Sequence, residues 1–363
     1  MNSFEFIQGE QGLLDLRPEW EALFARLPVR VHAQSWTWVS QQIRCLEADP
    51  PAVGIALLRR QGEVVALVPL RAEARAPSPF APARWSLLWD PHSTLSPALI
   101  APELGAVEAL EAIVRELRRQ GMRCDWLSGP SLLDDGRWGA HGQGVPAGRV
   151  VMQKLRPSMR FCTTAPGSAL AESSAHFRQN LGRQRRKLQA QGQVELHIAK
   201  GVEAAGEAFE DFLGIEASGW KGDGGTASAI ALHDGLRSFY AGVIDASAPS
   251  CEVWIATLRL DGRAVASNFC MRTGSTLGVL KIGYDESLKQ AAPGNVLLSM
   301  LIDACTEDPG ISELSLVTGP AWAERWCPQR VDVYRVEVFA SSLRGRITCA
   351  LRGLRRALRE RRR

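Results

Sequence analysis

Two stretches of the chain present the same order of secondary-structure signals. Each contains a two-residue turn between apolar runs, Gln61-Gly62 in the first stretch and Asp261-Gly262 in the second. A turn of this kind between apolar segments is typical of a β-hairpin. In both stretches a third extended run, an amphipathic helix and another strand follow, and that strand ends in a small residue, Gly and Pro, at 128–130 and 318–320. The pattern predicts an α/β protein with two copies of one unit; the alternative is a chance similarity within an α/β chain.

The spacing of apolar residues assigns the other segments of both copies. Apolar residues recur every three or four positions where we expect helices, and they alternate or run continuously where we expect strands. The predicted helices cover 13–27, 36–46, 107–117, 172–191, 203–219, 231–245 and 296–304, and the predicted strands cover 55–60, 64–70, 85–89, 124–127, 253–259, 265–272, 276–284 and 313–317. With 363 residues, the chain is long enough for two domains of about 150 residues each. We place them at 1–150 and 151–340, with a linker within 130–150.

Residues 341–363 form a separate basic element. They carry nine Arg and one Glu, whereas the net charge of the whole chain is only +4, so the remaining residues sum to −4. Ile347, Leu351, Leu354 and Leu358 follow at helical spacing and predict one apolar stripe on a basic helix. This pattern is typical of a helix that contacts a membrane surface; the alternative is a terminal helix packed on the body of the protein. The acidic remainder and the lack of a nucleic-acid-reading motif argue against nucleic acid as a partner.

The sequence contains no signal for secretion, membrane insertion or metal binding. The first residues, Met1 to Ile7, include neither a basic nor an apolar leader segment, so we expect no signal peptide. No stretch approaches the roughly 20 apolar residues of a membrane span. The eight Cys and six His are scattered without the spacing of metal ligands. We therefore predict a cytoplasmic protein without a metal, which contacts the inner face of the membrane only if the basic helix does so.

The segment after the predicted strand 276–284 has the features of an anion-binding loop. Pro293, Gly294 and Asn295 open the helix predicted at 296–304, and Lys289 lies shortly before them. The first turn of a helix leaves backbone N–H groups without partners and carries a partial positive charge, so it suits a pyrophosphate. The alternative is an ordinary Pro-Gly turn before a helix.

Three motifs of the second half together resemble one family. They are Trp-Lys-Gly-Asp-Gly-Gly-Thr-Ala at 220–227, the basic helix 176–188, and the segment from Tyr284-Asp285 to Pro293-Gly294. They resemble the cellulose-biosynthesis (CelD/BcsL-like) branch of the GNAT acyltransferases, which is distantly similar to the Fem-type peptidyl transferases. The resemblance covers about 170–340 well, whereas 1–150 match only in pattern.

The resemblance implies two tandem GNAT-like α/β domains, each a mixed central sheet flanked by helices, the first of them degenerate. It implies N-acyl transfer from a thioester, either acyl-CoA or an acyl carrier protein, to an amine. The acceptor implied is an amino sugar or an amino-bearing metabolite in polysaccharide or lipid biosynthesis. The donor-binding residues implied are Leu280, Lys281 and Ile282 on the strand, and Lys289, Gln290, Pro293, Gly294, Asn295 and Val296 in the phosphate loop.

The position of further residues beside these motifs suggests acceptor-binding and proton-transfer roles. Each of them also has an ordinary structural explanation, such as a solvated basic face or a loop anchored by Trp. The predicted substrate-binding residues are Arg178, Trp220, Lys221, Thr226, Tyr284 and Trp322. The predicted proton acceptor is one of Asp285, Glu216 and His233, and Asp285 leads because it follows the strand expected beside the thioester.

The sequence departs from the family pattern at two places. Trp322-Ala323 stand where the family often has a Tyr-Lys pair, and the phosphate loop lacks the usual Arg/Gln-x-x-Gly-x-Gly/Ala form. A carrier-protein donor would depend less on this loop than coenzyme A would. Two other functions stay open at this level: a Fem-like ligase that uses aminoacyl-tRNA, and a non-catalytic GNAT scaffold in a biosynthetic complex.

Overall fold

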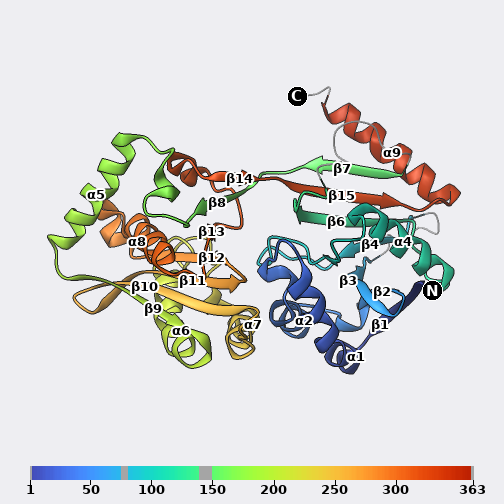
Figure 1. Cartoon of the computed structure of the whole chain (residues 1–363), viewed down its shortest axis with the longest axis horizontal. Helices are drawn as coiled ribbons and strands as arrows, with labels where there is room; N and C mark the ends of the chain where they lie inside the picture. The colour runs from blue at the N-terminus through green and yellow to red at the C-terminus, as the bar shows by residue number, and fades with distance from the viewer. Residues whose placement is uncertain (1, 75–80, 139–148, 361–363) are drawn as a thin grey trace. The chain divides into compact units, whose positions relative to one another are not determined.

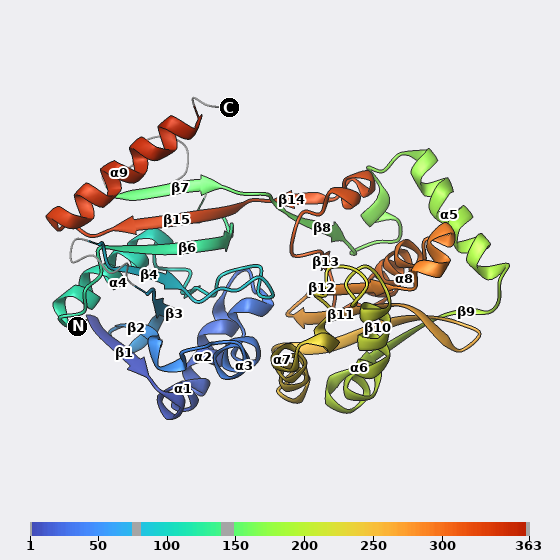
Figure 2. The ribbon, with the colours of Figure 1, turned by 180° about the vertical axis from the view of Figure 1, so that it is seen from behind.

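The computed structural model describes residues 2–74, 81–138 and 149–360, and the chain forms two compact units (Figures 1 and 2). The first unit contains Met1–Val29, Ala48–Arg156 and Asp332–Arg363. The second contains Arg30–Glu47 and Pro157–Val331. Each unit has a mixed β-sheet flanked by helices, so the predicted fold class is confirmed.

The sheet of the first unit has the strand order β1-β2-β3-β4-β6-β15-β7, with β5 beside β3. All neighbours are antiparallel except β4 and β6, which are parallel. The strands are β1 (Asn2–Gln8), β2 (Val53–Arg60), β3 (Glu63–Ala72), β4 (Arg84–Leu87), β5 (Leu99–Ile100), β6 (Trp126–Leu133), β7 (Val150–Lys154) and β15 (Val333–Phe339). The helices are α1 (Glu10–Asp15), α2 (Arg17–Arg26), α4 (Ala106–Arg119) and α9 (Leu343–Glu360).

The sheet of the second unit has the order β9-β10-β11-β12-β13-β8-β14. Only β12 and β13 are parallel. The strands are β8 (Ser158–Cys162), β9 (Val194–Lys200), β10 (Glu252–Leu260), β11 (Arg263–Thr273), β12 (Thr276–Tyr284), β13 (Glu313–Ser315) and β14 (Gln329–Val331). The helices are α3 (Trp36–Cys45), α5 (Ala175–Gln189), α6 (Gly201–Ser218), α7 (Asp234–Asp245) and α8 (Pro293–Glu307), and the short helices η6 (Glu286–Ala291) and η7 (Ala321–Trp326) flank the last of these.

The two main sheets repeat one topology, strand for strand. Along the seven-strand order of each sheet, every neighbouring pair is antiparallel except the fourth and fifth strands, which are parallel. That parallel pair is β4 and β6 in the first unit and β12 and β13 in the second. Both predicted hairpin turns are present, because Gln61, Gly62, Asp261 and Gly262 all have positive φ, as a type I′ turn requires. The predicted duplication is therefore present at the level of the fold.

The chain divides between the units at positions other than those predicted. β15 (333–339) falls within the predicted second domain, but it pairs with β6 and β7 of the first sheet. Residues from Asp332 onward therefore belong to the first unit. α3 belongs to the second unit, where the ring centroid of Trp38 lies 4.8 Å from that of Phe239 in an edge-to-face contact. Of the predicted linker, 139–148 lie outside the described residues. The chain passes between the units at 29–30, 47–48, 156–157 and 331–332. Strand pairing and apolar packing thus join segments that are far apart in sequence.

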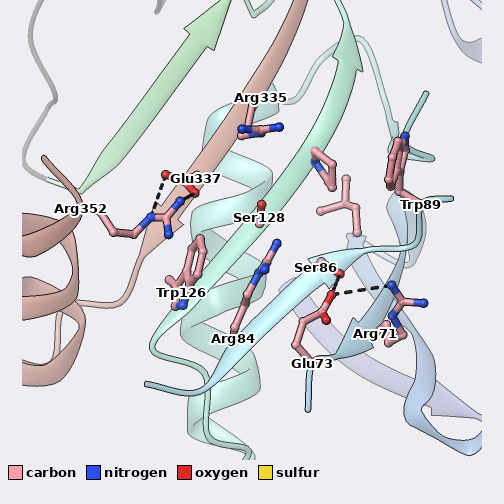
Figure 3. Close-up of a pocket in the computed structure, with 12 residues that line it drawn as sticks. Arg71, Glu73, Arg84, Ser86, Trp89, Trp126, Ser128, Arg335, Glu337 and Arg352 are labelled. Atoms are coloured by element: carbon pink, nitrogen blue, oxygen red, sulfur yellow. Dashed lines mark hydrogen bonds and ion pairs between the residues drawn. The ribbon is translucent and has the colours of Figure 1, made fainter. Parts of the chain in front are cut away.

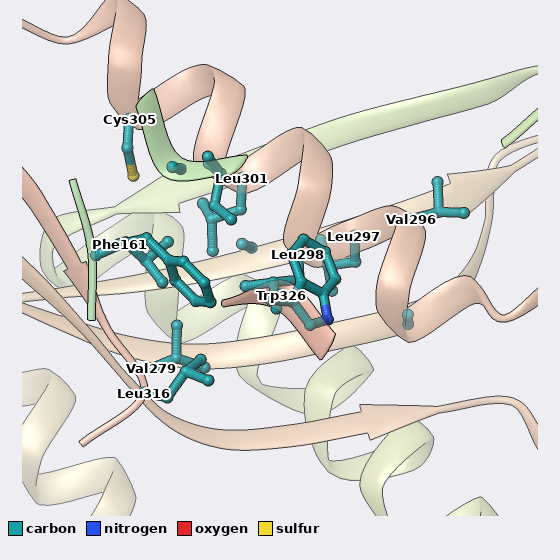
Figure 4. Close-up of a cluster of buried hydrophobic side chains, with 14 of the residues drawn as sticks. Phe161, Val279, Val296, Leu297, Leu298, Leu301, Cys305, Leu316 and Trp326 are labelled. Atoms are coloured by element: carbon teal, nitrogen blue, oxygen red, sulfur yellow. The ribbon is translucent and has the colours of Figure 1, made fainter. Parts of the chain in front are cut away.

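Apolar clusters cover both faces of the second sheet. On one face, Leu297 and Leu301 of α8 pack with Phe161 and Trp326 (Figure 4). On the other, α6, α7 and α3 bury a cluster that includes Phe269 of β11. Fully burying a large apolar side chain contributes about 1.5–3 kcal/mol. The central strands are thus held from both sides, which gives the neighbouring site a rigid base.

Candidate active site

β12 and β13 separate shortly after they begin to pair. They pair only from Thr276 to Gly278, opposite Glu313 to Ser315, whereas β12 continues to Tyr284. After β13 the chain turns away at Val317, whose φ is +61°. A β-branched residue in this region is strained, and such strain often marks a functional site. Beyond Gly278, the β13 side of β12 therefore has no strand partner in the described part of the chain.

A β-bulge lies in the separated part of β12. Phe269 of β11 is opposite Lys281 and Cys270 is opposite Val279, so Leu280 has no partner across the pair. A bulge leaves one residue out of the hydrogen-bond ladder and re-aims the side chains that follow. Here it places Ile282 opposite Asn268, so both side chains lie on the sheet face that α8 covers.

α8 begins beside the end of β12. Ala292, which precedes it, has φ +49°, and Pro293 occupies the first helical position. The first turn of α8 contains no acidic residue. A Cβ added to Gly294 would lie 3.6 Å from the Tyr284 ring, so any larger side chain here would extend toward the tyrosine. This helix N-terminus has the features of an anion site.

A cavity of about 290 Å³ lies between the separated strands and the start of α8. Its floor is continuous with the apolar cluster under α8, which supplies Val279, Leu298 and Leu316 (Figure 4). The lining residues are Asn268, Val279, Ile282, Gly283, Tyr284, Lys289, Ala292, Gly294, Asn295, Leu298, Leu316 and Trp322. Six of the predicted donor- and substrate-binding residues are among them: Ile282, Lys289, Gly294, Asn295, Tyr284 and Trp322.

Basic residues surround the α8 end of the cavity. Lys289 is exposed, and Asn295 Nδ2 donates to Gln184 Oε1 of α5 at 3.3 Å. Lys187 of α5 donates to the Gln290 carbonyl at 3.1 Å. These contacts hold α5 beside the loop, and α5 also carries exposed Arg183, Arg185 and Arg186. The predicted basic helix therefore lies beside the loop that is predicted to bind an anion.

Asn268 was not predicted from the sequence. It is only 4% exposed and lines the cavity, and its amide group has no hydrogen-bond partner among the described residues. The amide is not among the side-chain groups shut off from solvent, so it is open to the cavity and available to a ligand there. Its sequence signal is weak: Ser267-Asn268 interrupt an otherwise apolar strand.

Glu216 and Lys221 form a buried ion pair that fastens β12. Lys221 Nζ lies 2.8 Å from Glu216 Oε1 and donates to the Ile282 carbonyl, also at 2.8 Å. Glu216 Oε2 accepts from the backbone N–H of Ile230 at 2.9 Å. Both carboxylate oxygens are thus engaged, and neither Glu216 nor Lys221 lines the cavity. Their position indicates that they orient the open end of β12.

The loop 220–227 is closed by its own backbone. A Cβ at Gly222 would lie 2.0 Å from the Ala217 carbonyl oxygen, and one at Gly225 would lie 1.9 Å from the Trp220 carbonyl oxygen. The glycines of the motif are therefore required by close backbone approach. Trp220 is 55% exposed, and Thr226 bonds within the loop, to the Trp220 carbonyl at 3.3 Å.

The other predicted site residues lie outside the cavity lining. His233 Nε2 lies 2.9 Å from the Ala227 carbonyl oxygen, and Arg178 donates to the Ser173 and Leu170 carbonyls. Lys281 is on the opposite sheet face from Ile282, and Val296 is buried in the core. The remaining residues outside the lining are Leu280, Gln290 and Pro293.

Asp285 caps the short helix η6. Its Oδ1 accepts from the backbone N–H and hydroxyl of Ser287 at 2.9 and 2.6 Å, and Oδ2 accepts from Arg263 at 2.9 Å. The Ser287 hydrogen bonds, with the Arg263 charge, lower the pKa of Asp285 below its ordinary value of 3.8. A lowered pKa favours the carboxylate but weakens it as a base.

The family comparison matches the unit that holds this cavity. Residues 175–326 match the sequence model of the family described as "Acetyltransferase (GNAT) domain". The match covers 152 of the 363 residues, all of them within the second unit. This match assigns the domain to the transferases. Among curated proteins, none matches the chain significantly.

Solved structures show the same fold over nearly the whole chain. FemX has a TM-score of 0.52 at 12% identity over 91% of this chain and 96% of its own. The C-terminal DUF2156 domain of an Agrobacterium fabrum protein named as a lysylphosphatidylglycerol synthetase scores 0.53 at 12% identity, over 91% and 92%. A conserved Bacteroides thetaiotaomicron protein of unknown function scores 0.56 at 11% identity, over 93% and 100%. At these identities the likeness concerns the fold alone.

Two further features are absent from the described residues. None of the helices there is both long and apolar enough to cross a membrane. No group of three or more His, Cys, Asp or Glu side chains in that part of the chain is arranged to hold a metal ion.

Proposed function

We propose that the second unit transfers an acyl group from acyl-coenzyme A to an amine. The observation that carries this proposal is the cavity between the separated strands β12 and β13, which ends at the N-terminus of α8. An elongated thioester fits this arrangement, because its pantetheine amides need open strand edges and its phosphates need a cationic end. The cavity offers an open strand edge on β12 and a cationic end at the N-terminus of α8.

The residues present fit coenzyme A at its phosphate end. In the first turn of α8, Pro293 has no N–H and the Asn295 and Val296 N–H groups donate to the Ala292 carbonyl, so the Gly294 N–H is the group available to a phosphate. The turn has no competing acid, and Lys289 supplies a positive charge. Exposed arginines of α5 add further cationic groups nearby. The open side of β12 and the amide of Asn268 supply hydrogen-bonding groups for the pantetheine and the acyl carbonyl.

The reaction needs a nucleophile, a leaving group and two proton transfers. The amine nitrogen forms a bond to the thioester carbonyl carbon, the C–S bond breaks, and the sulfur leaves with the electron pair. Tyr284 lines the cavity, and its hydroxyl has no hydrogen-bond partner within the described residues, so we assign it the proton donated to the sulfur. The lining contains no carboxylate or imidazole in that part of the chain, so the proton lost by the amine passes to water, and a proton from water restores the Tyr284 hydroxyl.

The acceptor proposed is an amino sugar or an amino-bearing metabolite of polysaccharide or lipid biosynthesis. The resemblance to the cellulose-biosynthesis branch motivates this class. The exposed Trp220 supports it, because an aromatic face can pack on a sugar ring and its neighbour Lys221 contacts the open end of β12. A carrier-protein thioester is the alternative donor.

A ligand titration tests the proposal. We expect coenzyme A and acyl-coenzyme A to raise the melting temperature by mass action, and turnover with amine acceptors to follow. Gly294→Glu should abolish the shift, because its carboxylate would lie at the helix N-terminus toward Tyr284. Gly206→Glu is the matched control, since a Cβ there meets nothing within 4 Å. If no coenzyme A species shifts the wild type, coenzyme A is not the donor, and acylated carrier protein is tested next.

A further inference from the structure

The first unit holds a second cavity, of about 430 Å³, on one face of its sheet (Figure 3). Its walls come from the ends of β3, β4, β6 and β15, and α9 contributes Arg352. The lining residues are Arg71, Glu73, Arg84, Ser86, Leu87, Trp89, Trp126, Ser128, Pro130, Arg335, Glu337 and Arg352. None of them belongs to the unit that carries the proposed acyl-transfer site.

Two of the four arginines are neutralised by the two glutamates. Arg352 contacts Glu337 through two nitrogens, and the Nε–Oε2 distance is 3.2 Å. Arg71 lies 3.7 Å from Glu73, which also accepts from the Ser86 hydroxyl. Arg84 and Arg335 have no carboxylate partner among the described residues. The four arginines and two glutamates therefore leave a formal surplus of two positive charges.

The strand register brings the two unpaired arginines onto one face around Ser128. Arg84 of β4 is opposite Trp126 of β6. Two residues further along the same face, Ser128 of β6 lies between Ser86 of β4 and Glu337 of β15. Figure 3 shows the Ser128 hydroxyl between the guanidinium groups of Arg84 and Arg335. Ser128 is 1% exposed and makes no hydrogen bond from its hydroxyl to the described residues.

Two buried donors of the same cavity also lack acceptors. Arg84 Nε and Trp126 Nε1 are inaccessible to solvent and have no hydrogen-bond partner in the described part of the chain. The guanidinium carbons of Arg84 and Arg352 lie 4.8 and 4.2 Å from the centre of the Trp126 ring. Because these two atoms are shut off from solvent, a ligand in the cavity would meet the terminal nitrogens of Arg84 and the Ser128 hydroxyl instead.

We propose that this cavity binds a phosphate ester through Arg84, Ser128 and Arg335. A phosphate monoester is close to a dianion at neutral pH, which matches the surplus of two positive charges. Guanidinium groups bind phosphate oxygens with paired hydrogen bonds, and the Ser128 hydroxyl supplies a third donor. Trp89 provides an aromatic wall for the organic part of the ester. The proposal goes beyond the acyl transfer assigned to the second unit and does not depend on it.

Calorimetric titration of the full chain tests this site. The ligands are inorganic phosphate and glucose 6-phosphate, and a third arm measures co-sedimentation with phosphatidylcholine vesicles with and without phosphatidic acid. Saturable binding of the soluble ester identifies a free phosphate ester as the ligand class. Binding only to vesicles that contain phosphatidic acid identifies a lipid headgroup.

The variants separate this cavity from general charge effects. Arg84→Gln combined with Arg335→Gln should weaken phosphate binding at least tenfold. Arg60→Gln combined with Arg123→Gln removes the same charge from exposed positions outside the cavity and should stay within twofold of the wild type. The exposed Arg335→Gln alone serves if the double variant does not fold. Absence of binding in all arms, or equal losses in both double variants, would overturn the proposal.

Discussion

The two units share a strand order but differ in how far the fourth strand (β4 or β12) extends beyond its pairing with the fifth (β6 or β13). β12 continues for six residues after its pairing with β13 ends at Gly278. β4 pairs with β6 from Arg84 to Ser86 and ends one residue later, at Leu87. The second unit therefore has an open strand edge beside a cavity, whereas the first has almost none.

The helix after the fourth strand, α8 in the second unit and α4 in the first, also differs between the units in its first turn. α8 begins at Pro293 with no acid in its first turn, and Asn295 is its third residue. α4 begins at Ala106, and its third residue is Glu108, whose Oε2 lies 3.3 Å from a Cβ built on Gly105. A carboxylate at this position already interacts with the helix dipole, so it opposes an incoming phosphate. The proposed phosphate site of the acyl donor therefore lies at α8, whose first turn has no carboxylate, and not at the corresponding helix α4.

The largest expected effect on stability comes from removing the ion pair between Lys221 and Glu216 beside β12. Lys221→Met leaves the Glu216 carboxylate buried without its cation, and losing one partner of a buried pair costs about 3–5 kcal/mol. We expect hydrogen–deuterium exchange over 276–284 to accelerate accordingly, while β4 and β6 stay unchanged. Arg237→Met breaks an exposed pair with Glu210 and should cost less than about 1 kcal/mol. Equal protection in Lys221→Met and wild type would show that this pair does not hold β12.

The next effect concerns chemistry at the end of β12. Tyr284→Phe should lower kcat by about 10²-fold, because proton donation to the leaving sulfur is lost, while KM for the thioester changes less than about twofold. The matched control is Tyr334→Phe in the first unit, whose hydroxyl contacts Asp332. Steady-state kinetics measures both. An unchanged kcat in Tyr284→Phe would remove this residue from the reaction.

The third residue of the helix is Asn295 in α8 and Glu108 in α4, and exchanging it tests whether this position decides anion binding. Asn295→Glu gives α8 the acid that α4 has, and it should weaken coenzyme A binding at least about tenfold, or roughly 1.4 kcal/mol. The same change should stabilise α8 by about 0.3–1 kcal/mol through the helix dipole. Calorimetry and thermal melting measure the two effects. Asn295→Gln adds no charge and should weaken binding far less than Asn295→Glu, and Glu108→Gln should leave coenzyme A binding unchanged.

The smallest effect is expected at Asp285. Asp285→Ala removes the cap of η6 and should cost about 1 kcal/mol at neutral pH, with activity within about threefold of the wild type. Because the pKa of Asp285 is lowered in the folded state, its stabilisation is complete at pH values above the unfolded value. It is lost as the pH falls below 3.8 and through the folded pKa, so wild type and variant converge there. Denaturation midpoints against pH measure this, and a 100-fold loss of activity with intact stability would instead identify Asp285 as the proton acceptor.

Local signals in the sequence determined much of this protein. The turns at Gln61-Gly62 and Asp261-Gly262, the amphipathic pattern of α4 and the Pro293-Gly294 start of α8 depend on neighbouring residues, so periodicity and turn chemistry predict them. The duplicated fold follows from these signals, and so does the prediction of an anion-binding loop before α8.

Tertiary structure alone decided which side chains meet. Ile282 lies opposite Asn268 because a bulge at Leu280 shifts the register of two strands, and Lys221 donates to the Ile282 carbonyl across 61 positions of sequence. β15 completes the first sheet from the far end of the chain, and it brings Arg335 onto the face that carries Arg84 and Ser128. Such contacts depend on strand pairing and apolar burial between distant segments, and the pattern of neighbouring residues does not encode them.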